Sequence, residues 1–171
     1  MRNQMDLLSE VRQLLNNPPN LVQQLQNLLE ENKSLQKELQ EQKEAKALGL
    51  KDQLIKSAVR INGIQTLVSK VELGDSKICK SLIYNLGKEL EPAIIFFGFV
   101  EQEKPQLMCY ISEELTTSHA YNASTWLRQI AKHIQGGGGG QAFFSTAGGK
   151  NVQGIDTALE EARNILKQSL S

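Results

Sequence analysis

The chain has 171 residues, 40% of them hydrophobic, and its 19 basic residues balance 19 acidic ones. This length fits a single domain, or a small domain with an extended element attached. The charge balance also holds separately before and after residue 58, which excludes a generally basic nucleic-acid-binding domain, so any such site must be local.

Cysteine usage and hydropathy exclude two further classes. Cys79 and Cys109 belong to no C-x-x-C pair and the sequence has only 2 histidines, which argues against a structural zinc site. The longest apolar run, residues 93–100, is too short to cross a membrane, and the N-terminus lacks the apolar core of a signal peptide. We therefore expect a cytoplasmic protein with two buried, reduced thiols.

Two helices are predicted at the start of the chain. Apolar residues recur at helical spacing within residues 4–16. Asn16 and Asn17 end this helix, and the following Pro18-Pro19 favours the start of another, which we predict over residues 20–57. Together the two helices form an arm, residues 1–57.

The long helix carries a heptad seam, in which apolar residues alternate in steps of four and three with Glu, Lys and Gln at the flanks. Asn32 occupies an a position, where a buried asparagine fixes the register and strand number of a coiled coil. Two arrangements stay open: the seam pairs with a second copy of the chain, or it packs against residues 4–16 as a hairpin, and both can hold on different faces of the helix. The candidate dimerisation residues are Leu21, Leu25, Leu28, Asn32, Leu35 and Leu39.

Residues 58–171 predict a compact domain in which strands and helices alternate. Residues 59–72 are rich in β-branched side chains and contain an Asn-Gly turn signal, which indicates a strand or a bent pair of strands. A helical stripe begins after Asp75 and is expected to end at Gly87.

Two antiparallel strands are predicted next, at residues 93–100 and 106–112, because only a short polar turn joins them. The first is apolar throughout, which is typical of a central strand buried on both faces. A helix follows over residues 123–135, then five glycines, a strand over 141–147 and a last helix over 155–169. We therefore predict an α+β fold: a small α/β-type domain with a mixed sheet of roughly four to five strands and flanking helices, preceded by the helical arm.

The glycine run from Gly136 to Gly140 is the most unusual feature of the sequence. Glycines expose backbone N–H groups and take positive φ freely, so a run of them can form a concave anion site suited to phosphate. A flexible linker is the alternative. We favour a phosphate-binding loop, rigid and with its amides turned outward, because the run lies between a predicted helix and an apolar strand, and Gly148-Gly149 closes the segment.

The order of a helix, a glycine run, a small-residue stretch ending in A-G-G-K and a final helix resembles the DHH-associated domain, in particular the version at the C-terminus of alanyl-tRNA synthetases. Residues 28–39, the V-x-x-N-G segment at 59–63 and the strand at 93–100 occur in the same order there, so the similarity covers nearly the whole chain. One departure is the Gln-Ala-Phe triplet after the glycines, which replaces an Arg-Pro-Asp-like triplet and removes charge that would meet phosphate.

The resemblance implies a function without catalysis in this chain, as the C-terminal tRNA-binding and dimerisation region of an alanyl-tRNA synthetase. Its partners would be tRNA(Ala), held by its outer corner, and a second copy of the chain in a homodimer. Aminoacylation and editing, with their ATP and zinc, would belong to domains that precede Met1, so no cofactor is expected in this chain.

Several residues beside the glycine run are candidates for contacting RNA. Arg128 and Lys132 lie four positions apart on one helix face, Lys150 follows the second glycine pair, and His133 is able to stack on a base or donate to phosphate. For each cation alone a solvated surface charge is the simpler interpretation, and for His133 a favourable position at a helix end. The candidate RNA-binding residues are Gly136, Gly137, Gly138, Gly139, Gly140, Gln141, Arg128, Lys132, His133 and Lys150.

The sequence indicates no catalytic residue and no metal site. No aspartate adjoins a histidine, no H-x-x-x-H or cysteine–histidine cluster occurs, and Ser145-Thr146 lacks a base to activate a nucleophile. Two alternatives to the synthetase stay open: the substrate-binding half of a DHH-type oligonucleotide phosphodiesterase, and a coiled-coil scaffold without affinity for RNA. The coiled coil favours the synthetase over the phosphodiesterase.

Overall fold

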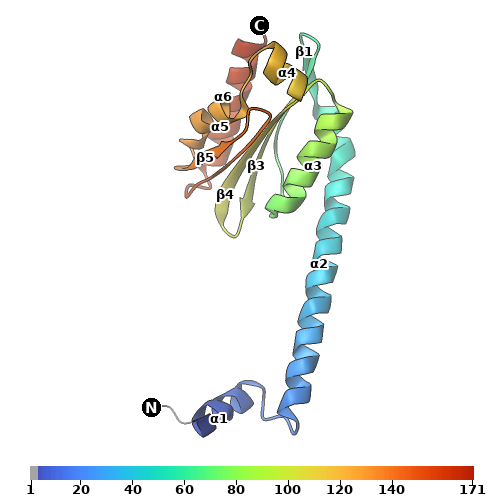
Figure 1. Cartoon of the computed structure of the whole chain (residues 1–171), viewed down its shortest axis with the longest axis vertical. Coiled ribbons are helices and arrows are strands. Elements are labelled where there is room, and N and C mark those ends of the chain that lie inside the picture. The colour runs from blue at the N-terminus through green and yellow to red at the C-terminus, as the bar shows by residue number, and fades with distance from the viewer. Residues whose placement is uncertain (1–3) are drawn as a thin grey trace. The chain divides into compact units, whose positions relative to one another are not determined.

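The computed structural model describes residues 4–171. The chain divides into two compact units, Met1–Gln42 and Lys43–Ser171. The first unit contains helix α1, Gln4–Leu14, and the beginning of helix α2, Leu21–Ser57 (Figure 1).

The helix α1 is shorter than the predicted helix 4–16, because Asn16 and Asn17 take φ angles of 60° and 51°, a left-handed conformation that ends a helix. None of the residues of α1 is buried, so the hairpin in which α1 covers the seam of α2 is not formed in the described residues. Pairing of the seam between two chains stays a prediction. The exposed fractions of four seam leucines are 40%, 39%, 57% and 53% for Leu25, Leu28, Leu35 and Leu39.

The second unit begins within α2, whose last part belongs to the globular core. Ala47 and Leu54 are buried in the same hydrophobic cluster as helix α3, Ser76–Glu89. Lys43 Nζ lies 3.4 Å from the Oδ2 atom of Asp75. The Oδ1 atom of Asp75 accepts hydrogen bonds from the backbone N–H groups of Lys77 and Ile78 in the first turn of α3. The junction between the long helix and the domain is therefore both packed and capped.

The second unit is built on a mixed six-stranded sheet with the order β1-β2-β3-β4-β6-β5. The pair β2 and β3 is parallel, with α3 as its crossover helix, and all other neighbours are antiparallel. The predicted α+β fold is confirmed, with more strands than expected because the glycine run is itself a strand. The strands are β1 Val59–Ile61, β2 Ile64–Lys70, β3 Ala93–Glu101, β4 Lys104–Ile111, β5 Gly137–Gly140 and β6 Phe144–Gly148.

Helices cover both faces of this sheet. The helix α3 lies on one face, and α4 (Glu113–Ser118), α5 (Ala123–Ala131) and α6 (Gly154–Ser169) lie on the other (Figure 1). Phe96 and Phe97, neighbours in the central strand β3, pack into opposite clusters and have no exposed surface. The prediction of a central strand buried on both faces is thus confirmed.

Two predicted helix ends in the second unit are wrong as well. The helix α3 does not end at Gly87 but continues beyond it, and a Cβ atom at Gly87 would lie 2.2 Å from Cε1 of Tyr110. Glycine is present there because the helix approaches the sheet closely, and not to end the helix. The helix predicted over residues 123–135 ends at Ala131, after which a turn leads to Gln135 with a φ of 51°.

Both cysteines are expected to resist thiol reagents in the folded protein. Cys79 in α3 and Cys109 in β4 have no exposed surface, which confirms the predicted burial. Burial raises the pKa of the Cys79 thiol to about 12, with smaller contributions from Asp75 and Glu101, and burial alone raises the pKa of Cys109 well above its usual value. Because the thiolate is the reactive form, we expect negligible labelling by a disulfide reagent at about pH 8 and complete labelling in denaturant; rapid labelling of the native protein would contradict the packing.

Candidate functional site

The glycine run forms an edge strand and not the predicted open loop. The four glycines of β5 pair antiparallel with β6, from Gly137 opposite Gly148 to Gly140 opposite Ser145. The N–H of Gln141 donates to the carbonyl oxygen of Phe144 at 2.8 Å and closes the hairpin. The physical reason is that backbone groups of an ordered segment need partners, and β6 supplies them along one side of the run.

Only alternate amides of β5 face the open edge of the sheet. Bonded and non-bonded pairs alternate along an antiparallel ladder, and Gln141 with Phe144 is a bonded pair. Gly139 and Gly137 therefore turn their N–H and C=O groups toward β6, whereas Gly138 and Gly140 turn theirs outward. The expected cradle of consecutive outward amides is wrong, and an edge with spaced donors and acceptors takes its place.

Alternate glycines of the run are also required by their distance from β6. A Cβ atom at Gly138 would lie 2.3 Å from the carbonyl oxygen of Thr146, and one at Gly140 would lie 2.5 Å from that of Phe144. At Gly137 and Gly139 an added Cβ would meet no atom within 4 Å. The run thus combines positions that exclude any side chain with positions that leave space beside the strand.

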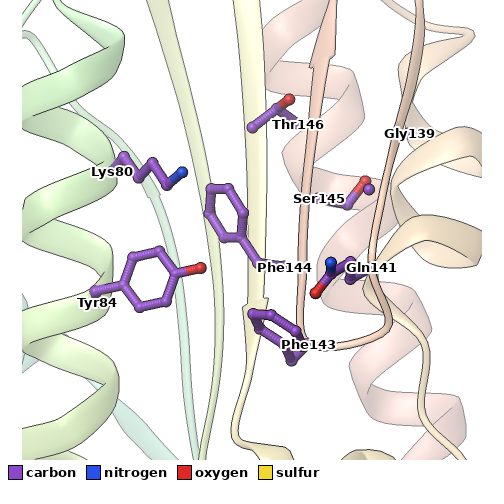
Figure 2. A pocket seen from close by; sticks show the side chains of 9 residues that line it. Lys80, Tyr84, Gly139, Gln141, Phe143, Phe144, Ser145 and Thr146 are labelled. Carbon is purple, nitrogen blue, oxygen red and sulfur yellow. The ribbon is translucent and has the colours of Figure 1, made fainter.

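On the face of the sheet that carries α3, a hollow of about 340 Å³ lies between that helix and the β5–β6 hairpin. Figure 2 shows Lys80 and Tyr84 of α3 pointing toward the ring of Phe144 in β6, with Phe143 and Thr146 on the same side. The edge of β5 forms the opposite rim. The sheet therefore brings one cation, three aromatic rings and a stretch of bare backbone to a single place.

Aromatic contacts hold this hollow in shape. The ring centroids of Tyr84 and Phe144 are 5.1 Å apart, and Tyr84 meets Tyr110 edge to face at 5.4 Å. Lys80 Nζ lies 5.2 Å from the centroid of the Phe144 ring, within the range of a cation–π contact. Burial, and to a smaller extent the charge of Glu113, raises the pKa of Tyr84, so its phenol stays protonated at neutral pH.

The predicted cations lie on the other side of the sheet edge. Arg128 and Lys132 are exposed and line a shallow hollow on the outer side of α5, as their spacing predicted. Neither forms an ion pair within residues 4–171. His133 and Lys150 belong to segments that are joined just before β5. Asn151 Nδ2 donates to the carbonyl oxygen of His133 at 3.2 Å, and the N–H of Lys150 donates to that of Ile134 at 2.9 Å.

Sequence reasoning missed the cation and the aromatic residues of the hollow on the α3 side, although Gly139, Gly140 and Gln141, which also line it, were among the predicted RNA-binding residues. Lys80 and Tyr84 are four positions apart on an amphipathic helix, which marks them as neighbours. No local pattern indicates that this helix faces Phe144, because that contact depends on the pairing of β4 with β6. In the part of the chain that the structure describes, no group of three or more His, Cys, Asp or Glu side chains is arranged to hold a metal ion. No described helix is long and apolar enough to cross a membrane.

Comparison with known proteins identifies the domain. Residues 63–168 match the family model of the DHHA1 domain, which includes the glycine strand, the β6 strand and α3. The chain belongs to the DHHA1 domain family. The resemblance found in the sequence is thereby confirmed for the globular domain.

Curated relatives of this DHHA1 chain are alanine–tRNA ligases. It is 40% identical over 164 residues to that of Christiangramia forsetii, covering 96% of this chain and 19% of the relative. It is 35% identical over 158 residues to that of Porphyromonas gingivalis, covering 91% of this chain and 18% of the relative. The chain therefore spans about a fifth of the length of these relatives.

A solved structure has the same fold. The C-Ala domain of alanyl-tRNA synthetase from Aquifex aeolicus is 22% identical to this chain, with a TM-score of 0.56. The match covers 67% of this chain and 98% of that domain. The likeness supports the fold of the DHHA1 domain described above.

Proposed function

We propose that this chain is the tRNA-binding and dimerising C-terminal part of a cytoplasmic alanine–tRNA ligase. It holds tRNA(Ala) while other parts of the enzyme carry out aminoacylation and editing. The observation that carries this proposal is the open glycine edge, with cations on its α5 side and an aromatic hollow on its α3 side. The kinship with alanine–tRNA ligases supports tRNA as the RNA.

The contacts follow from the chemistry of the edge. Arg128, Lys132 and Lys150 supply positive charge to the phosphate backbone, and the outward N–H groups of Gly138 and Gly140 donate to phosphate oxygens without a side chain in between. The Gln141 amide and the His133 ring extend this surface at its two ends. Because the whole chain carries no net charge, the binding energy comes from this local group and not from a general positive field.

The helical arm supplies the second proposed role, dimerisation. Four leucines of the seam on α2 are exposed in the described residues of one chain, and burying such leucines against a second copy is the usual outcome for a heptad pattern. Two domains joined in this way present two RNA-binding edges. A homodimer therefore explains both the leucine seam and the presence of Asn32 within it.

The test is a salt titration of binding to a tRNA(Ala) transcript, with an RNA duplex of equal length as competitor. We expect a preference for the tRNA and affinity that falls as salt rises, because phosphate contacts release counterions. The double variant Arg128→Gln, Lys132→Gln should reduce the slope of log K against log salt by roughly two and weaken binding at about 0.1 M salt by tenfold or more.

The matched control is Lys56→Gln with Lys167→Gln, which removes the same charge from exposed positions near β1, at the opposite edge of the sheet from β5. This control variant should leave the slope of log K against log salt within error of the value for the parent protein. Equal affinity for tRNA and duplex would contradict the tRNA assignment, and no affinity for either would favour a scaffold role.

A further inference from the structure

The hollow between α3 and the β5–β6 hairpin shares Gly140 and Gln141 with the phosphate contacts described above, but its cation and its three rings have no role in them. At about 340 Å³ it is at the lower end of the roughly 300–1,000 Å³ that is usual for small-ligand pockets. None of the described residues that line it is acidic, and Lys80 is their one charged side chain. Its charge therefore suits an anionic ligand, or a neutral group attached to an anion.

The walls of the hollow suit a flat aromatic group. Three aromatic rings line the hollow, those of Tyr84, Phe143 and Phe144. A phosphate group alone gains no stacking energy from these rings. A nucleobase gains stacking energy from such rings regardless of its identity, which is how proteins hold unpaired bases of RNA. The hydroxyl group of Thr146 and the amide of Gln141 lie at the rim, where they can meet the polar edge of a base (Figure 2).

We propose that this hollow receives one unstacked nucleobase of the bound RNA, packed against Tyr84 and Phe144, with the adjoining phosphate on Lys80. The proposal rests on the proposed function, since the RNA is the tRNA held by the glycine edge. Lys80 is exposed, lines the hollow and holds its Nζ 5.2 Å from the centroid of the Phe144 ring, so its ammonium is within reach of the phosphate of an inserted nucleotide. The base enters beside Gly139, whose missing side chain keeps the opening clear.

Stacking and phosphate contacts have different salt signatures, which makes the proposal testable with the tRNA(Ala) transcript. We expect Tyr84→Leu to weaken binding about tenfold at every salt concentration, with the slope of log K against log salt unchanged. Tyr84→Phe keeps the ring and should bind as the parent does. Lys80→Gln should lower the slope by roughly one, and the charge control Lys167→Gln should leave both quantities unchanged.

A second variant avoids the risk that a change at Tyr84 disturbs the core. Gly139 lies opposite Thr146, so a side chain at 139 points into the hollow, where an added Cβ meets no atom within 4 Å. Gly139→Val should therefore block the hollow, weaken tRNA binding about tenfold and leave the melting temperature unchanged.

The outcomes separate this inference from the proposed function. If the parent protein binds the tRNA but Tyr84→Leu and Gly139→Val bind it equally well, the hollow holds no base, whereas the tRNA-binding role stands. If Tyr84→Leu lowers the slope of log K against log salt, the hollow binds only a phosphate and no base, which would overturn the proposal. If the parent protein fails to bind the tRNA, both proposals fall together.

Discussion

Gly138→Ala is expected to lower the free energy of unfolding by about 3 kcal/mol, whereas Gly139→Ala is expected to change it by less than about 1 kcal/mol. The two residues are neighbours in one strand, but only Gly138 would place its Cβ against the backbone of β6, 2.3 Å from the carbonyl oxygen of Thr146. That contact requires the strands to separate. The added methyl group at Gly139 meets open space and restricts the unfolded chain slightly.

Urea denaturation measures this difference. The single tryptophan, Trp126 in α5, packs against the cluster on that face of the sheet and serves as a fluorescence probe, with circular dichroism as a second. Gly140→Ala should behave like Gly138→Ala, since its Cβ would lie 2.5 Å from the carbonyl oxygen of Phe144. Equal effects at 138 and 139 would show that β5 does not pair closely with β6.

Leu28→Lys combined with Leu35→Lys is expected to convert a dimer into a monomer of 19.0 kDa. Both leucines occupy d positions of the seam and are exposed in the single chain. Losing a buried leucine costs roughly 2–5 kcal/mol, so removing two layers should weaken the dimer by a factor of about a thousand or more. The introduced lysines also repel one another across the seam.

Sedimentation equilibrium gives the mass directly. Leu48→Lys is the matched control, because Leu48 is an exposed leucine of the same helix outside the seam. Asn32→Leu should change the oligomeric state without abolishing association, because an apolar a position no longer specifies strand number. A parent protein that sediments as a monomer, or masses unaffected by all three seam changes, would exclude the coiled-coil dimer.

Local patterns in the sequence predicted most of the helices and strands. The apolar spacing of α3, α5 and α6, and the uninterrupted apolar run of β3, depend on side chains within a few residues of one another. Gly87 and the glycine run were misassigned because glycine permits many conformations and selects none. In each case a distant partner decided the structure: the ring of Tyr110 for Gly87, and the backbone of β6 for the run.

The sequence by itself determined the DHHA1 kinship, the alternation of helices and strands, and the leucine seam, because each is a pattern of residue types along the chain. Only the tertiary structure decided that the glycines form the edge of the sheet and that Lys80 and Tyr84 face Phe144. The pairing of β4 with β6 joins residues far apart in the chain, and such pairing depends on the packing of the whole sheet. The order of the strands therefore brings the residues of the candidate site together, and the sequence alone does not show that they are neighbours.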